Sequence, residues 1–321
     1  MCGPRSAYNQ PGMLHNLARC GLGVVMLAAV AARPHLDAQG NKLAIAHRGA
    51  SGYAPEHTLA AYRLAMAQHA DFVEPDLGVS KDGVLICLHD DTLERTTNIA
   101  KVFPARPSPD APRRGPARRW LANDFTVEEI RRLDAGSWFN EQFAGQRVPT
   151  FQEMIDLVRG KAGLYPELKS PPLYVARGVD MEQLFVRVIK QNSLDAPASL
   201  KTTPVIVQSF DEATIRRVAV DLPAIPRVFL TGHDEDVTEA RIRELATFTT
   251  GIGPEKKVLA RHPEMVKRAH DAGMTVVAWT FRADEKTAFP TVRDEMAHFL
   301  YTLGIDALFT NNPDLFPRRG R

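Results

Sequence analysis

The chain has 321 residues, of which 44% are hydrophobic and 24% are charged. This composition is typical of a globular protein and excludes disordered, collagen-like and coiled-coil chains. Lys and Arg number 40 and Asp and Glu number 38, a formal charge of +2 that leaves no bulk positive excess to hold a polyanion, so nucleic acid is not expected as a partner.

The first 38 residues have the pattern of a secretory signal peptide. Arg5, His15 and Arg19 precede an apolar run over residues 20–32, and polar and small residues follow it. These thirteen residues are fewer than the about 20 that a membrane-spanning helix needs. We predict that residues 1–38 are removed on export to the periplasm or beyond, leaving no stable membrane anchor. An uncleaved anchor or a disordered tail is the alternative, and the cleavage site and the first Met stay open.

Removal of the leader changes the charge and the cysteine count of the chain. It takes away three Arg and one Asp, so the mature chain is formally neutral. Of the three cysteines only Cys87 remains, which excludes an internal disulfide. The exported chain must therefore be stabilised by its core.

From residue 42 onward, β-type runs alternate with helix-type segments, which is typical of βα units around a parallel sheet. The predicted strands cover residues 42–47, 71–79, 163–169, 204–208, 225–230, 248–252, 274–279 and 307–310, with a short extended run at 84–89. The predicted helices cover residues 57–68, 150–159, 180–191, 211–220, 239–246, 263–272 and 290–303. Eight strand-and-helix steps in about 280 residues predict an α/β fold of the (β/α)8 TIM-barrel type over residues 39–321. A doubly wound sheet is the alternative, but no G-x-G-x-x-G motif follows any predicted strand.

One segment breaks the alternation. Residues 103–119 carry five prolines and five arginines, a composition unsuited to a core element. We expect a solvated loop within an inserted region of about residues 100–135. The insertion follows the run at 84–89, so a lid or a substrate-contacting role is the alternative.

Acidic residues interrupt the apolar strands near their carboxyl ends, where barrel enzymes place catalysis. Glu74 and Asp76 are two positions apart, as are Glu167 and Lys169, so each pair faces one side of its strand. Three carboxylates then point into one mouth, which is unfavourable unless a cation lies between them. Oxygen ligands favour a hard ion, so the sequence predicts one divalent metal ion, Ca²⁺ or Mg²⁺.

Two histidines and two cations lie near the same carboxylates in the predicted barrel. His47 and His89 end extended segments, and one histidine acting as base while another acts as acid suits chemistry near neutral pH. Arg48 and Lys169 supply positive charge for a docked anion such as phosphate. Each residue is weak support alone, but together they predict cleavage of a phosphodiester.

A set of linked motifs runs along the chain at compatible spacings. The motifs are HRGA at 47–50, APEHT at 54–58, VEPDL at 73–77, SKDG at 80–83, LHD at 88–90, RTTN at 95–98, YPELK at 165–169, QSF at 208–210, AHDAG at 269–273, VAWT at 277–280, GID at 304–306 and FT at 309–310. Together they resemble the glycerophosphodiester phosphodiesterase family over about residues 42–316, and most closely its exported, periplasmic branch.

The resemblance implies a TIM barrel and a role for each residue singled out above. The matching positions are Glu74, Asp76 and Glu167 for the metal, His47 and His89 for acid and base, and Arg48, Lys169 and Glu56 around the phosphate. The implied substrates are small glycerophosphodiesters such as glycerophosphocholine and glycerophosphoethanolamine. In the implied reaction a glycerol hydroxyl attacks phosphorus, and water opens the resulting cyclic phosphate to give glycerol 3-phosphate and an alcohol.

Two positions depart from the family pattern. His57 stands where Asn is usual after Pro-Glu, and we expect it to cap the following helix rather than to add a titratable group at the mouth. Asn311 stands where Asp is usual after the last Phe-Thr, and we expect it to alter head-group preference more than catalysis. Trp279 and Phe210 follow later strands and are candidates to face the alcohol, although core packing is the usual role of aromatic residues.

Two other functions compete with this prediction. A phospholipase D type activity on lysophospholipid or sphingomyelin uses the same barrel and histidines, but the insertion shows no apolar rim for a membrane substrate. A metal-binding surface protein without turnover is the alternative from another class. It has no need of the acid and base that His47 and His89 provide. The oligomeric state stays open.

Overall fold

The computed structural model describes residues 41–109 and 118–318. The strands are β1 (Leu43–His47), β2 (Phe72–Glu74), β3 (Asp76–Val79), β4 (Leu85–Cys87), β5 (Gly163–Leu164), β6 (Glu167–Leu168), β7 (Val207–Ser209), β8 (Arg227–Thr231), β9 (Gly251–Pro254), β10 (Thr275–Phe281) and β11 (Ala307–Thr310). The α-helices are α1 (Leu59–Ala67), α2 (Ile99–Val102), α3 (Val127–Ile130), α4 (Phe151–Val158), α5 (Pro171–Val175), α6 (Met181–Gln191), α7 (Pro197–Thr202), α8 (Glu212–Asp221), α9 (Glu239–Leu245), α10 (Lys256–Arg261), α11 (Met265–Asp271) and α12 (Val292–Ala297).

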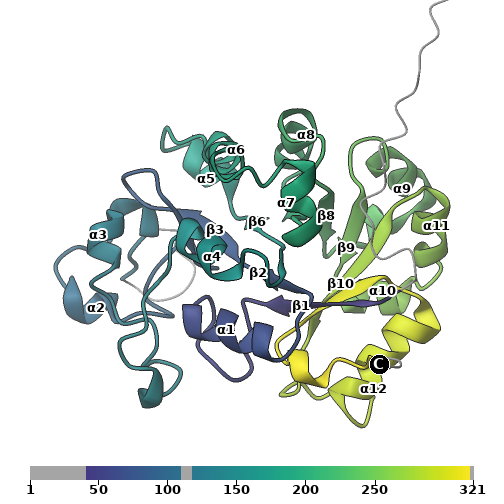
Figure 1. Cartoon of the computed structure of the whole chain (residues 1–321), viewed down its shortest axis with the longest axis horizontal. Helices are drawn as coiled ribbons and strands as arrows, with labels where there is room; N and C mark the ends of the chain where they lie inside the picture. Colours follow the sequence, from purple (N-terminus) through teal and green to yellow (C-terminus); the bar gives the residue numbers. More distant parts are fainter. Residues whose placement is uncertain (1–40, 110–117, 319–321) are drawn as a thin grey trace, which may run out of the picture. The chain divides into compact units, whose positions relative to one another are not determined.

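The parallel strands close on one another with helices outside them (Figure 1). β2 and β3 are one strand interrupted at Pro75, and β5 and β6 are the next strand, interrupted at Tyr165 and Pro166. β1 pairs with β2 and with β11, β2 and β3 pair with β5 and β6, and β6 to β11 pair in chain order. The described residues thus form eight parallel strands in a closed ring, which confirms the predicted (β/α)8 barrel. β4 is an antiparallel addition to β3.

The differences from the predicted elements have local causes. Proline has no backbone N–H to donate, which explains why the predicted strands 71–79 and 163–169 are each split. The predicted helix 290–303 is shorter, because α12 passes into a π-helical turn over His298–Leu303. The short helices α5 and α7 begin with proline and were not predicted.

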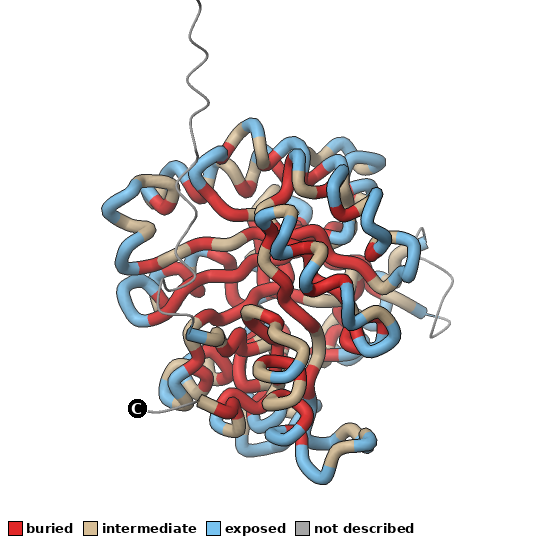
Figure 2. The backbone as a smooth tube through the Cα atoms, turned by 90° about the vertical axis from the view of Figure 1, so that its right-hand side faces the viewer, coloured by how far each residue is buried: buried red, intermediate tan, exposed pale blue. Residues whose placement is uncertain are grey.

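Apolar side chains fill the barrel and the space between strands and helices. Ile45, Phe72 and Phe309 belong to the buried cluster formed by the strands themselves, and Tyr165 joins it with its ring against Phe309. Two larger clusters lie between the strands and the helices. Figure 2 shows these buried residues inside a shell of exposed helix surfaces and loops. The rigid interior leaves the strand ends as the place for polar side chains.

The chain between β4 and α4 forms a further buried cluster beside the barrel, which includes Leu93, Trp120 and Phe125. Residues 103–109 have neither helix nor strand and are exposed or half-buried, as the loop prediction expects, whereas residues 110–117 lie outside the described part. Arg119 forms an ion pair with Glu94, which attaches the end of this loop to the cluster.

The predicted leader, residues 1–38, also lies outside the described residues. Among the residues that are described, no helix has the length and apolar character needed to cross a bilayer.

Candidate active site

Three carboxylates converge at the carboxyl ends of two adjacent strands. Glu74 ends β2, Asp76 begins β3 and Glu167 begins β6, with Asp76 and Glu167 in direct register across the sheet. One oxygen from each carboxylate lies within 4.8 Å of the other two. All three side chains are buried. The strand periodicity therefore placed these residues correctly, and their crowding makes them the candidate ligands for a metal ion.

The charges of this cluster are unevenly balanced. Burial, together with the charges of Asp76 and Glu167, raises the pKa of Glu74 well above its usual value. Burial also raises the pKa of Glu167 to about 8, although Lys169 opposes the shift from 3.0 Å. Burial acts the same way on Asp76, but the charge of Lys169 and a hydrogen bond from His57 outweigh it and hold the pKa of Asp76 well below its usual value.

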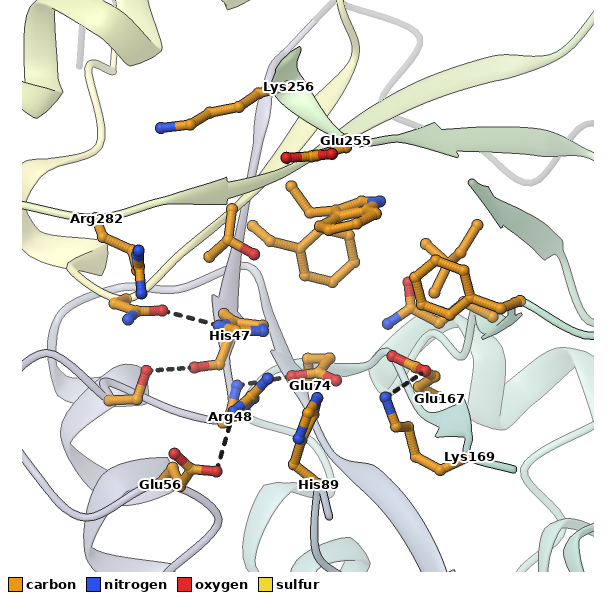
Figure 3. Close-up of a pocket in the computed structure, with 18 of the residues that line it drawn as sticks. His47, Arg48, Glu56, Glu74, His89, Glu167, Lys169, Glu255, Lys256 and Arg282 are labelled. Carbon is orange, nitrogen blue, oxygen red and sulfur yellow. Dashed lines mark hydrogen bonds and ion pairs between the residues drawn. The ribbon is translucent and has the colours of Figure 1, made fainter. Parts of the chain in front are cut away.

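The two candidate catalytic histidines line the same cavity and have different partners (Figure 3). The Nδ1 atom of His47 lies 2.8 Å from Oδ1 of Asn311, which follows β11. Burial, reinforced by the charge of Arg48, lowers the pKa of His47 to about 3. The Nδ1 atom of His89 lies 2.7 Å from a carboxylate oxygen of Asp90. His47 is thus held neutral against an amide, whereas His89 faces a negative charge.

A chain of ion pairs connects Arg48 to His89. Arg48 contacts Glu56 at 3.0 Å, and Glu56 contacts Arg95 at 2.7 Å. Arg95 in turn contacts Asp90 at 2.6 Å, the residue that holds His89. Among these charges, the pKa of Glu56 is lowered to about 2, because hydrogen bonding to Arg95 and the charge of Arg48 outweigh its burial. The network fixes the first strand relative to the segment that carries His89.

The backbone at Arg48 turns its N–H group toward the carboxylates. Arg48 has a φ of 58°, and its amide nitrogen lies 2.7 Å from Oε2 of Glu74. Gly49 follows with a φ of 84°, and a Cβ there would lie 2.7 Å from the carbonyl carbon of Ala61. The glycine is therefore required by both the turn and the close approach of α1.

The cavity has a volume of about 480 Å³ and a second wall opposite the carboxylates. Figure 3 shows Glu255, Lys256 and Arg282 on the side away from His89 and Glu167. Lys256 is buried and contacts Glu285 at 2.9 Å and Glu295 at 3.0 Å. This wall is polar and charged, so the cavity suits a small polar ligand better than an acyl chain.

Two aromatic residues close a further side of the cavity. Trp279 donates its indole N–H to the carbonyl of Gly253 at 2.7 Å, and its ring lies edge-to-face with Phe210 at 5.5 Å. Both rings line the cavity, and Phe210 is 47% exposed. Both rings are therefore placed to contact a ligand, while Trp279 also packs against the cluster inside the barrel.

The structure corrects the expectation for His57. Helix α1 is capped by Thr58, whose hydroxyl accepts from the amide of Ala61, so His57 is not the cap. His57 is buried, with only 3% of its surface exposed, and contacts Asp76 and Tyr62 at 2.9 Å each. The predicted cap is one residue too early, because the helix begins at Leu59 and its cap is therefore Thr58.

The structure adds a contact for Asn311, which was expected to alter head-group preference more than catalysis. Its side-chain oxygen lies 2.8 Å from Nδ1 of His47. The absence of a carboxylate at this position therefore acts on a candidate catalytic group.

Comparison with known proteins agrees with this geometry. Residues 47–315 match the model of the glycerophosphoryl diester phosphodiesterase family. The chain belongs to this family. A glycerophosphodiester phosphodiesterase of Bacillus subtilis is 33% identical over 303 residues, which cover 91% of each chain. One from Haemophilus influenzae is 29% identical, covering 85% of this chain and 88% of its own.

Solved structures of the family have the same fold. A phosphodiesterase of Oleispira antarctica, solved with the product sn-glycerol-3-phosphate, is 26% identical with a TM-score of 0.67, covering 86% of this chain and 95% of its own. A glycerophosphodiester phosphodiesterase of Agrobacterium tumefaciens is 26% identical with a TM-score of 0.60, covering 86% of this chain and 99% of its own.

Sequence reasoning missed several residues of this glycerophosphodiester phosphodiesterase site. Asp90 and Arg95 belong to the LHD and RTTN motifs, but the sequence analysis predicted no role for either residue. Contacts of Lys256 reach Glu285, 29 residues away, and Glu295, 39 residues away, and no local pattern signals them.

Replacing Asn311 by Asp should raise the pKa of His47 above its present value of about 3. The new carboxylate would face Nδ1 and stabilise the imidazolium form. The pKa can be measured by NMR titration of the ring protons, with assignment by comparison to His47→Gln. A pKa that stays unchanged or falls would contradict the assigned contact between Asn311 and His47.

Proposed function

We propose that this protein is a metal-dependent glycerophosphodiester phosphodiesterase that uses His47 and His89 as its base and acid. The proposal is carried by one observation: two members of a buried cluster of three carboxylates, Glu74 and Glu167, line one small polar cavity together with the two differently held histidines. Family membership supports the reaction class. The substrates proposed are small glycerophosphodiesters, such as glycerophosphocholine and glycerophosphoethanolamine.

The residues of the acidic cluster fit a divalent cation. Glu74, Asp76 and Glu167 provide only oxygen ligands, and Oδ1 of Asp76 is buried without a hydrogen-bond partner. Hard cations such as Mg²⁺ and Ca²⁺ prefer such ligands. A bound cation would supply charge neutralisation for the phosphoryl oxygens. Lys169 and Arg48 add fixed positive charge on two sides of the same cluster.

The two histidines suit opposite proton transfers. His47 is neutral near pH 7 because burial lowers its pKa, so its Nε2 atom is available to take the proton of the attacking glycerol hydroxyl. The oxygen then forms a bond to phosphorus as the bond to the alcohol breaks. His89, with a carboxylate accepting from Nδ1, donates a proton to the leaving alcohol. Water opens the cyclic phosphate with the two roles reversed, which yields glycerol 3-phosphate.

Metal-restored hydrolysis is the test of this function. The purified mature chain should release glycerol 3-phosphate from glycerophosphocholine, lose the activity on chelation, and regain it when Ca²⁺ or Mg²⁺ is restored separately. The product is quantified enzymatically and the more effective ion is thereby identified. A folded protein that releases none with either ion would contradict the proposal and favour lysophospholipid cleavage or a binder without turnover, which vesicle and metal-binding assays would distinguish.

His47→Ala and His89→Ala should each lower kcat about 100-fold to 10,000-fold, the usual contribution of a positioned acid or base. Metal binding should remain, because neither histidine belongs to the acidic cluster. His233→Ala is the matched control, since His233 is largely exposed and outside the cavity. A histidine variant with near-normal turnover would exclude that residue from its role.

We also propose that the protein is exported, with residues 1–38 as a cleaved leader. The observation behind this proposal is the order of basic residues, a short apolar run and small residues at the N-terminus. Expression of the full chain in a bacterial host should place activity in the periplasmic fraction or the medium. Intact mass should show a chain shortened near residue 38. A full-length protein retained in the cytoplasm would refute export.

A further inference from the structure

His57 holds the most deeply buried carboxylate of the acidic cluster. Its Nε2 atom lies 2.9 Å from Oδ2 of Asp76, and its Nδ1 atom lies 2.9 Å from the hydroxyl of Tyr62. An ionised carboxylate only accepts hydrogen bonds, so Nε2 of His57 is the donor, and the Tyr62 hydroxyl can donate to Nδ1. Both ring nitrogens are satisfied in this single arrangement, which fixes the orientation of the ring.

The local backbone directs His57 inward. Its φ of 60° lies in the left-handed region, which histidine adopts more readily than most residues. Its amide donates to the carbonyl of Arg48 at 3.0 Å, so the two left-handed residues are tied together. This backbone hydrogen bond therefore holds both His57 and Arg48 beside Asp76.

The two oxygens of Asp76 have different surroundings. Oδ2 receives the hydrogen bond from His57, and Nε of Arg48 lies 3.3 Å away as an ion-pair contact. Oδ1 is buried and has no hydrogen-bond partner among the described residues, and Nζ of Lys169 lies 3.9 Å from it. Glu167 is the register partner of Asp76, and its Oε1 lies 3.0 Å from the same Nζ of Lys169. One oxygen is thus occupied by the protein, and the other faces the acidic cluster.

We propose that His57 is a positioning residue that keeps Oδ2 of Asp76 engaged and so presents Asp76 to the metal ion through Oδ1 alone. This inference rests on the proposed function, because it assumes that the acidic cluster binds a divalent cation. Mg²⁺ requires strict octahedral geometry, whereas Ca²⁺ accepts one or both oxygens of a carboxylate in a flexible shell. A carboxylate fixed in this way favours Mg²⁺. Loss of the hydrogen bond from His57 should therefore weaken Mg²⁺ binding more than Ca²⁺ binding.

A matched pair of variants tests the hydrogen bond. His57→Gln places an amide donor close to the position of Nε2, whereas His57→Met has a similar length without a donor. Isothermal titration calorimetry on the complete mature chain, after its metal has been removed by chelation, gives the dissociation constants for Mg²⁺ and Ca²⁺. We expect His57→Met to weaken Mg²⁺ binding about 10-fold to 100-fold, the usual loss when a residue that supports a ligand is removed, with a smaller loss for Ca²⁺. His57→Gln should stay close to the wild type.

Equal affinities for the two variants, or equal losses for the two ions, would overturn the inference. If His57→Met does not fold, Tyr62→Phe takes its place, since it frees Nδ1 while leaving the imidazole. It should weaken Mg²⁺ binding more than Ca²⁺ binding, and unchanged Mg²⁺ binding would again overturn the inference. A wild-type chain that binds neither ion would instead refute the metal site of the proposed function, which separates the two failures.

Discussion

Three carboxylates confined within 4.8 Å in a buried site impose the constraint on which the rest of the site depends. The protein compensates only one of them fully, because Arg48, His57 and Lys169 all act on Asp76. Glu74 has the charge of Arg48 and a hydrogen bond from the Arg48 amide, and Glu167 has Lys169, but burial and the neighbouring carboxylates outweigh them and raise both pKa values. Like charges so close in a low dielectric favour protonation or an added cation. The surplus of carboxylates is thus what makes the cluster suited to a divalent ion.

The barrel meets this constraint through its backbone. Pro75 and Pro166 interrupt neighbouring strands, yet the amide of Glu167 still donates to the carbonyl of Pro75 at 2.9 Å, which keeps the two interrupted strands in register. Asp76 therefore faces Glu167, and Glu74 faces His47 on the other side. Strand pairing therefore sets the separations between these groups.

Periodicity could predict the parts of this site that lie within one strand. Glu74, Asp76 and Glu167 were found because residues two apart share a face, and the eight strands were found because each is a short apolar run. The partners of these residues were not predictable in the same way. Lys256 meets Glu295 only because α10 and α12 pack near the same strand ends, and Asn311 meets His47 because β11 closes the ring against β1. Closure brings together residues more than 260 positions apart, which no local pattern encodes.

His47 and His89 follow different kinds of strand, and this difference affects how each side chain is held. His47 belongs to the end of β1 and is fixed by β11, so it is part of the rigid ring. His89 follows the antiparallel β4, outside that ring, where the amide of Leu88 donates to the carbonyl of Asp76 at 2.9 Å. Beyond this backbone contact, its imidazole is oriented by ion pairs through Asp90, Arg95 and Glu56, in which the side chain of Arg95 is 41% exposed. Exposed ion pairs are individually weak. In the proposed reaction, proton donation to the leaving alcohol is consequently the step most sensitive to changes in these ion pairs, whereas deprotonation of the attacking hydroxyl is tied to the integrity of the barrel.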